Sequence, residues 1–163
     1  MLPSPQPEIR RAEPEDAPAI ANLLRESFAA FEPLYTAGGF SATTPTAQKV
    51  LERIQEGAVW VALRNAEVLG TVAIVVKGKA GYIRGMAVLP SARGTGIGAK
   101  LLQHVENWAS EAQCVRLFLS TTPFLSEAIC LYERFGFRRA DAGPNDLFGT
   151  PLFTMEKTIF PRK

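Results

Sequence analysis

The most informative stretch of this 163-residue chain is residues 88–100, which read VLPSARGTGIGAK. Gly94, Gly96 and Gly98 remove three Cβ atoms where a predicted strand runs into a predicted helix. Backbone N–H groups there can approach an anion closely, and a helix beginning at Ile97 adds the positive end of its dipole. Arg93 supplies a fixed cation beside them. The stretch therefore predicts a site for a phosphate-bearing ligand.

Two common phosphate-binding motifs fit this loop poorly. A Walker P-loop requires Gly-Lys followed by Ser or Thr, whereas residues 98–101 read GAKL. The dinucleotide pattern G-x-G-x-x-G/A is met by Gly94, Gly96 and Ala99. In that motif, however, the glycines follow the strand directly and the next strand ends in an acidic residue, whereas here residues 120–122 read STT. Dinucleotide binding stays open only as a distant alternative.

Length and composition describe an ordinary globular chain of about one domain. The net charge of +2 is too small to predict a nucleic-acid partner. One histidine and two cysteines do not favour a metal centre or a disulfide framework, and both cysteines are expected to be buried. The N-terminus lacks the features of a signal peptide, and no apolar run is long enough to span a membrane. The sequence thus predicts a single domain over residues 1–163, cytoplasmic, without a membrane partner.

The order of predicted elements favours an α+β fold (mixed α/β). Three sequential strands with short connections predict an antiparallel meander, and a later strand–helix–strand unit favours parallel pairing. The result is a central mixed, mostly antiparallel sheet with helices on both faces. Residues 32–43 are rich in Pro and Gly and are expected to form turns. The expected strands cover residues 9–12, 58–63, 68–77, 82–89, 115–120, 137–139 and 152–159, and the expected helices begin at residues 14, 45, 97 and 126.

Two motifs in the expected order resemble the GNAT (general-control N-acetyltransferase) superfamily. Residues 93–98, RGTGIG, match its Q/R-x-x-G-x-G/A pyrophosphate loop, and residues 86–90, MAVLP, look like its fourth strand. Residues 128–137, AICLYERFGF, look like its A-x-x-L-Y-x-x-x-G-F segment. The resemblance covers nearly the whole chain. It implies a sheet that splays into a V between strands four and five, acetyl-CoA as cosubstrate, and transfer of an acetyl group to a primary amine.

The resemblance also implies where acetyl-CoA binds. Pantetheine would pair with the fourth strand beyond a bulge at Gly85, and the diphosphate would lie on the backbone amides of the glycine loop. Leu125 stands where many members have an asparagine, so one polar contact with the cofactor is expected to be lost. The implied cofactor-binding residues are Met86, Ala87, Val88, Arg93, Gly94, Thr95, Gly96, Ile97, Gly98, Ala99, Ser120 and Ala128.

Tyr132 is the residue that the resemblance implies as catalytic acid. It would protonate the departing thiolate, and ordinary pKa values of about 10 for a phenol and 8.5 for a thiol make that transfer uphill by ~2 kcal/mol. The alternative is a packing role, because Leu131 and Phe135 share its helix. A covalent route through Cys130 is disfavoured. Cys130 and Tyr132 are two positions apart, which places their side chains about 200° apart around the helix, so they point in different directions.

The acceptor and the general base are less well defined. Residues 82–88 contain no carboxylate, although many members have a glutamate in this strand as base. A site without that base suits an amine of low pKa, because deprotonating an α-amine at pH 7 costs only ~1 kcal/mol against 4–5 for a lysine-like amine. The resemblance implies that residues 141–151 and the segment between the first helices shape the acceptor pocket. The candidate acceptor residues in that segment are Phe28, Phe31, Glu32 and Tyr35.

Two readings of function follow from these features. The first is an acetyl-CoA-dependent N-acetyltransferase that works by direct attack in a ternary complex. The alternative is a catalytically silent module that binds or senses acyl-CoA, which needs only the glycine loop. The resemblance is also compatible with a homodimer, since dimers are common among similar proteins.

Overall fold

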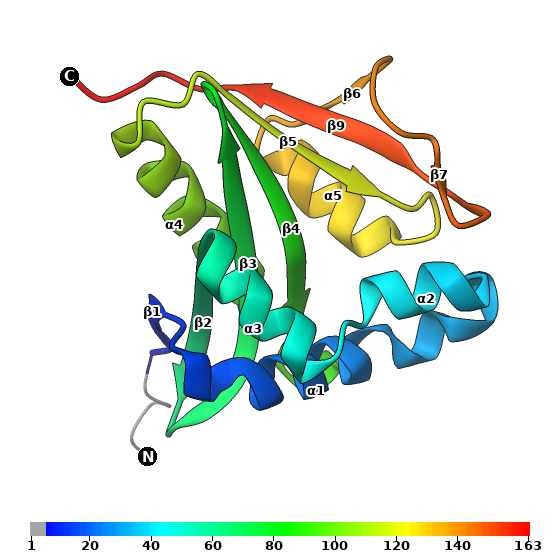
Figure 1. Cartoon of the computed structure of the whole chain (residues 1–163). Helices are drawn as coiled ribbons and strands as arrows, with labels where there is room; N and C mark the ends of the chain where they lie inside the picture. Colours follow the sequence, from blue (N-terminus) through cyan, green and yellow to red (C-terminus); the bar gives the residue numbers. More distant parts are fainter. Residues whose placement is uncertain (1–5) are drawn as a thin grey trace.

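A computed structural model describes residues 6–163 of the chain. The strands and helices that the sequence predicts are present in the predicted order, with most boundaries within two residues (Figure 1). A helix at Ala37–Thr43 and a short hairpin within residues 146–151 form in addition. The strands are β1 (Glu8–Arg11), β2 (Ala58–Arg64), β3 (Glu67–Lys77), β4 (Ala80–Val88), β5 (Arg116–Thr121), β6 (Arg138–Ala140), β7 (Asp146–Leu147), β8 (Thr150–Pro151) and β9 (Phe153–Thr158). The helices are α1 (Ala17–Phe28), α2 (Ala37–Thr43), α3 (Ala47–Glu56), α4 (Ile97–Glu111) and α5 (Ser126–Arg134).

Seven strands form one mixed sheet in the order β1-β2-β3-β4-β5-β9-β6, while β7 and β8 make a separate small hairpin. Every neighbouring pair in the large sheet is antiparallel except β4 and β5, which are parallel. These two strands pair only along Ala80–Tyr82 and Arg116–Phe118. Beyond Tyr82 they diverge, and Figure 1 shows β4 and β5 together at one end and apart at the other. The V expected between strands four and five is confirmed.

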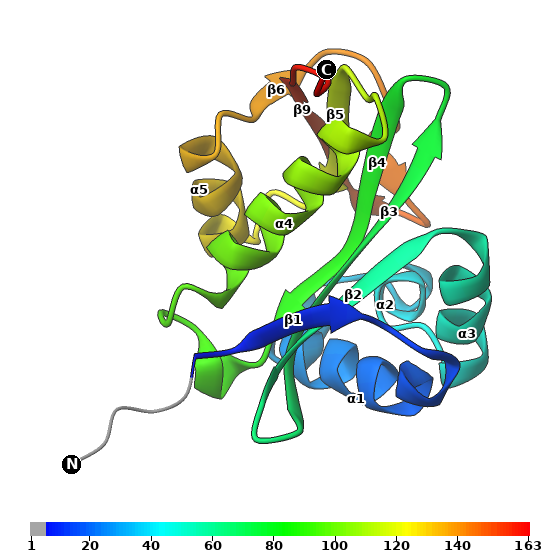
Figure 2. The same ribbon diagram turned by 90° about the vertical axis from the view of Figure 1, so that its left-hand side faces the viewer.

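Helices cover both faces of the sheet, as predicted (Figure 2). On one face lie α4 and α5, and α4 buries an apolar stripe that includes Leu101 and Val105. On the other face α1 packs with α3 and buries Leu23 and Leu24. The helices on both faces turn apolar stripes toward the sheet, and the sheet presents β-branched residues to them. The hydrophobic core therefore forms between the sheet and each helix layer.

The segment between α1 and α3 differs from the prediction of turns. It forms a 3-10 helix, Ala29–Leu34, followed by α2. The Thr36 side chain caps α2 by accepting a hydrogen bond from the Gly39 N–H, and the Thr36 N–H donates to Thr150 Oγ1 at 2.9 Å. Such caps and tertiary hydrogen bonds outweigh the poor helix propensity of Gly38 and Gly39.

Three smaller expectations also need correction. The helix expected from Pro14 begins as a 3-10 turn, and α1 proper starts at Ala17. Helix α3 is capped by Thr46, two residues later than expected. Cys114 is buried as predicted, but Cys130 is exposed on α5. Among the described residues, no helix is long and apolar enough to cross a membrane.

Candidate active site

The glycine loop joins β4 to α4 through a 3-10 turn, Pro90–Ala92. Gly94 and Gly96 have positive φ angles of 81° and 86°, and a Cβ on either would meet no atom within 4 Å. Gly96 is also the N-cap of α4, whose first turn contains no acidic side chain. The N–H groups of that turn have no acceptor within the helix and lie at the positive end of its dipole, which fits a diphosphate.

Gly98 has a different reason for being glycine. It lies inside α4, and a Cβ there would come within 2.9 Å of Leu131 Cδ2 and 3.6 Å of Met86 Cε. The missing side chain allows α4 to approach α5 and β4 closely. Its role in this structure is helix packing, so of the three glycines only Gly94 and Gly96 open the loop to an anion.

The Arg93 side chain is fixed by hydrogen bonds to two backbone carbonyls. Its Nη2 donates to the Ser27 carbonyl at 2.8 Å and its Nε donates to the Val88 carbonyl at 3.3 Å. The Ser27 hydroxyl also donates to the Val88 carbonyl, at 3.3 Å. Arg93 thus fastens the loop to α1 and to the end of β4, and its backbone N–H donates to the Pro90 carbonyl at 3.4 Å.

A β-bulge reshapes β4 just before the expected pantetheine-binding residues. The register with β3 shifts between Thr71 and Ala73, and Gly85 adopts a φ of +59°. Met86 and Val88 approach Gly98 and so face α4 and α5, while Ala87 is buried on the opposite face. The bulge expected at Gly85 is therefore present.

Tyr132 lies on α5 with only 8% of its surface exposed. Its ring packs against Phe137, with 6.0 Å between the ring centroids. Burial raises the pKa of Tyr132 to about 12, and no hydrogen bond to its phenol is found within residues 6–163. Transfer to a thiol with a pKa near 8.5 is then uphill by ~5 kcal/mol, more than the ~2 kcal/mol worked out from the sequence. Both the packing role and the acid role remain compatible with this position.

The far side of the V carries the other two expected cofactor residues. Ser120 lies on β5, opposite Thr154 of β9, and Ala128 lies in the first turn of α5. Both are half-buried. Leu125 is the N-cap of α5 and provides no side-chain cap. Ser120 and Ala128 thus lie on β5 and on the helix that follows it, across the opening from β4.

Three aromatic rings join the expected acceptor segment to the loop after β5. The Tyr35 ring meets Phe124 edge-on at 4.8 Å, and Phe31 stacks on Phe124 at 6.2 Å. Phe28 instead packs against the core, and Glu32 is exposed. Phe124 was missed in the sequence, because a lone aromatic after a predicted strand carries no pattern of its own.

The second expected acceptor loop lies against the first. Thr36 Oγ1 donates to the Phe148 carbonyl at 2.7 Å, and a Cβ on Gly38 would come within 2.8 Å of Phe148 Cβ. The Phe148 side chain itself is 71% exposed. The β7–β8 hairpin is thus fixed to α2, and the two segments predicted to shape the acceptor pocket form one continuous wall.

Two arginines were not singled out by the sequence. Arg84 follows the point where β4 leaves β5, and Arg53 lies in the last turn of α3. They meet beside Gly85, on the face of the sheet opposite α4 and α5. Their spacing in the chain gives no signal, because only the bulge and the packing of α3 bring them together.

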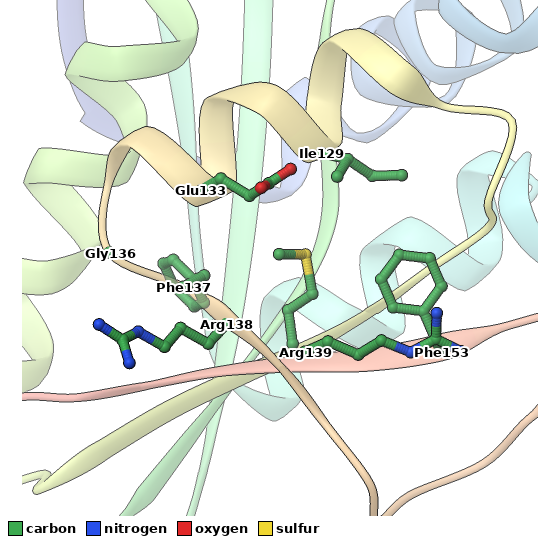
Figure 3. Close-up of a pocket in the computed structure, with 8 residues that line it drawn as sticks. Ile129, Glu133, Gly136, Phe137, Arg138, Arg139 and Phe153 are labelled. Carbon is green, nitrogen blue, oxygen red and sulfur yellow. The ribbon is translucent and has the colours of Figure 1, made fainter.

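A separate cavity of about 610 Å³ lies between α5, β6 and β9 (Figure 3). Arg138 and Arg139 border it from β6, and Arg139 lies 4.6 Å from the Phe153 ring centroid. It contains none of the residues expected to bind acetyl-CoA. Phe137 borders this cavity and also packs against Tyr132.

Comparison with known proteins agrees with this geometry. The acetyltransferase (GNAT) family profile matches residues 18–137. The uncharacterized N-acetyltransferase YjgM of Escherichia coli is 34% identical over 141 residues, which cover 83% of this chain and 84% of that protein. An IAA acetyltransferase of Azospirillum brasilense is 39% identical over 103 residues, covering 61% of this chain and 66% of that protein.

Among solved structures, the PaiA N-acetyltransferase of Thermoplasma acidophilum, in complex with coenzyme A, has a similar fold. Its TM-score is 0.81 at 19% sequence identity, over 95% of this chain and all of that one. The family profile and the identity to YjgM extend well beyond the two motifs quoted above. The chain therefore belongs to the GNAT family of acetyltransferases, for which acetyl-CoA is the cosubstrate.

Proposed function

We propose that this protein transfers the acetyl group of acetyl-CoA to a primary amine by direct attack in a ternary complex, with Tyr132 as general acid. The observation that carries the proposal is the open loop at Gly94 and Gly96, which stands at the N-terminus of α4 beside the widening gap between β4 and β5. Acetyl-CoA supplies a reactive thioester. The chain supplies the binding surface, the orientation and the proton.

The cofactor surface follows the expected residues. Backbone amides from Gly94 to Ala99 hold the diphosphate, since the Arg93 amide already donates to the Pro90 carbonyl, and Met86, Ala87 and Val88 line the pantetheine. Ser120 and Ala128 close the other side. Because two donors already reach the Val88 carbonyl, this oxygen is the least available of the strand's pairing groups.

The reaction requires one bond to form and one to break. The neutral amine nitrogen attacks the thioester carbonyl carbon, the carbon–sulfur bond breaks, and the sulfur receives the Tyr132 proton. The nitrogen releases its extra proton to water, and the phenolate regains one from solvent. No carboxylate is assigned as base: Glu56 pairs with Arg84, and the Arg84 hydrogen bond keeps the pKa of this carboxyl below its usual value.

The raised pKa of Tyr132 does not prevent this role. The same burial that disfavours the phenolate also disfavours a thiolate leaving into that environment, so both pKa values rise. The difference in pKa between the phenol and the leaving thiol therefore narrows, and the proton transfer costs less than the ~5 kcal/mol that applies to an exposed thiol. A direct route also agrees with Cys130, which is exposed and lies on a different side of α5.

The acceptor reaches the thioester past the aromatic wall of Phe31, Tyr35 and Phe124. An edge-on and a stacked contact hold these rings together, so they present a preformed apolar surface. This wall suits an amine with an apolar body.

The test is a screen of amines with acetyl-CoA, following thiol release and identifying the acetylated product by mass spectrometry. Coenzyme A affinity is measured in parallel by calorimetry. We expect binding of the coenzyme and turnover of at least one amine class. Binding without turnover would favour the silent module, and absence of binding would overturn the proposal.

A further inference from the structure

Arg53 and Arg84 come from different elements and lie side by side at the bulge of β4. Arg84 Nη2 pairs with Glu56 Oε2 at 2.8 Å, so its side chain points toward α3. Arg53 Nη1 would be only 3.2 Å from a Cβ on Gly85, so the guanidinium rests against the bare glycine. The glycine thus creates the space that the second guanidinium occupies.

The hydrogen-bonding capacity of this pair is incompletely used. Among the described residues, the Nε atoms of both Arg53 and Arg84 are buried and have no hydrogen-bond partner. A buried donor without a partner is costly, and native structures contain few of them. Both side chains are partly exposed elsewhere, with 21% exposure for that of Arg84, so a ligand can reach their outer edges.

The local charge is also unbalanced. Within residues 6–163, Glu56 pairs with Arg84, and no carboxylate forms an ion pair with Arg53. Burial lowers the pKa of Arg53, and the positive charge of Arg84 lowers it further. Two guanidinium groups against one carboxylate leave one positive charge in excess, which matches a ligand group with a single negative charge.

The position relates this pair to the reaction. Tyr82 and Phe118 are the last residues through which β4 and β5 pair, and their rings stack at 5.1 Å. Arg84 follows two residues later, where the strands have begun to separate. It faces α3, whereas Met86 faces α4 and α5, where the pantetheine is expected. The arginine pair therefore borders the gap from the side opposite the cofactor.

We propose that Arg53 and Arg84 bind a carboxylate of the acceptor, so that the substrate is an amine that also carries a carboxyl group, as an α-amino acid does. This inference rests on the proposed acetyl transfer and specifies its acceptor. Two planar guanidinium forks suit a carboxylate, which accepts paired hydrogen bonds in one plane. Binding of this group at the outer edges of the two side chains adds hydrogen bonds to the pair and balances the extra charge.

The test compares the twenty L-α-amino acids with their matched α-carboxamides as acceptors. We expect kcat/KM for the best amino acid to exceed that for its amide by about 100-fold, because the amide lacks the charge that the pair recognises. Arg53→Met and Arg84→Met should reduce this ratio at least tenfold, to about 10 or less, whereas Arg25→Met, at an exposed position of α1, should leave it unchanged.

Several outcomes would overturn the inference while leaving the proposed function intact. One is equal acetylation of amino acids and amides; another is fastest acetylation of amines that have no carboxylate. A variant that slows both members of a pair equally would indicate a structural role. A preference for a 1-aminoalkylphosphonate over its amino-acid counterpart would show that the arginine pair recognises a dianionic group rather than a carboxylate.

A second measurement does not depend on turnover. The melting temperature of the wild-type protein is recorded with each amino acid and each amide, with and without coenzyme A. Stabilisation by a carboxylate ligand that disappears in Arg53→Met supports the site even if no acetyl transfer is found. If neither amino acids nor their N-acetyl derivatives stabilise the protein more than the amides do, the carboxylate site is wrong.

Discussion

Replacing Tyr132 with phenylalanine removes the proposed acid while keeping the ring. The ring contact with Phe137 is preserved, and the lost hydroxyl has no hydrogen-bond partner within residues 6–163. Tyr132→Phe should therefore change the free energy of unfolding by no more than about 0.5 kcal/mol. Any large change in rate then reports on chemistry rather than on folding.

The size of the rate effect follows from the pKa of Tyr132. General acids contribute about 100- to 10,000-fold, and an acid with a pKa of about 12 belongs near the lower limit, because it donates its proton reluctantly. We expect kcat for the fastest amine of the screen to fall about 100-fold, with KM for acetyl-CoA unchanged. The ratio of wild type to variant should also be constant up to about pH 10, because the buried phenol stays protonated over that range.

The assay is steady-state thiol release across this pH range, with coenzyme A affinity measured separately. A kcat that remains within about threefold of the wild type would refute the acid role and assign Tyr132 to packing. A rise in KM for acetyl-CoA with kcat unchanged would instead make the phenol a cofactor contact.

Three further predictions concern the loop and the buried phenol. Gly96→Ala places a Cβ at a φ of +86°, which costs about 1–2 kcal/mol and hinders approach of the diphosphate, so calorimetry should show coenzyme A affinity falling at least tenfold; unchanged affinity would contradict the loop assignment. Arg93→Met removes hydrogen bonds to the Ser27 and Val88 carbonyls and should lower the free energy of unfolding by about 1–2 kcal/mol in urea titration, whereas Arg25→Met should not. The raised pKa of Tyr132 means that the folded state retains a proton that the unfolded state loses above about pH 10, so the free energy of unfolding falls between about pH 10 and 12. In Tyr132→Phe this fall should be smaller by up to ~3 kcal/mol, and identical plots of unfolding free energy against pH for the two proteins would show that the pKa is not raised.

The glycine loop could be predicted from the sequence because its signal is local. Glycine spacing, a strand before it and an apolar helical stripe after it all lie within residues 82–109. The parallel pairing of β4 and β5 was likewise predictable, because a strand–helix–strand unit of this length favours it. Local patterns therefore predicted the antiparallel meander, the parallel pair and the glycine loop.

The features that were missed depend on contacts between distant parts of the chain. Helix α2 contains two glycines and forms where Thr36 meets Thr150, 114 residues later. The sequence predicts Arg93 as a fixed cation but does not show that its side chain donates to the Ser27 carbonyl. The raised pKa of Tyr132 follows from its burial, which the sequence does not give. None of these properties has a local sequence signature.

The bulge at Gly85 divides β4 into a part proposed to contact the acceptor and a part expected to contact the coenzyme. Arg84, before it, belongs to the surface proposed to select the acceptor, and Met86, after it, belongs to the surface expected to hold the coenzyme. An extra residue reverses the alternation of side chains, so neighbours in the chain serve opposite sides of the sheet. On this proposal, we expect substitutions at position 84 to alter the choice of amine during evolution while coenzyme binding is conserved.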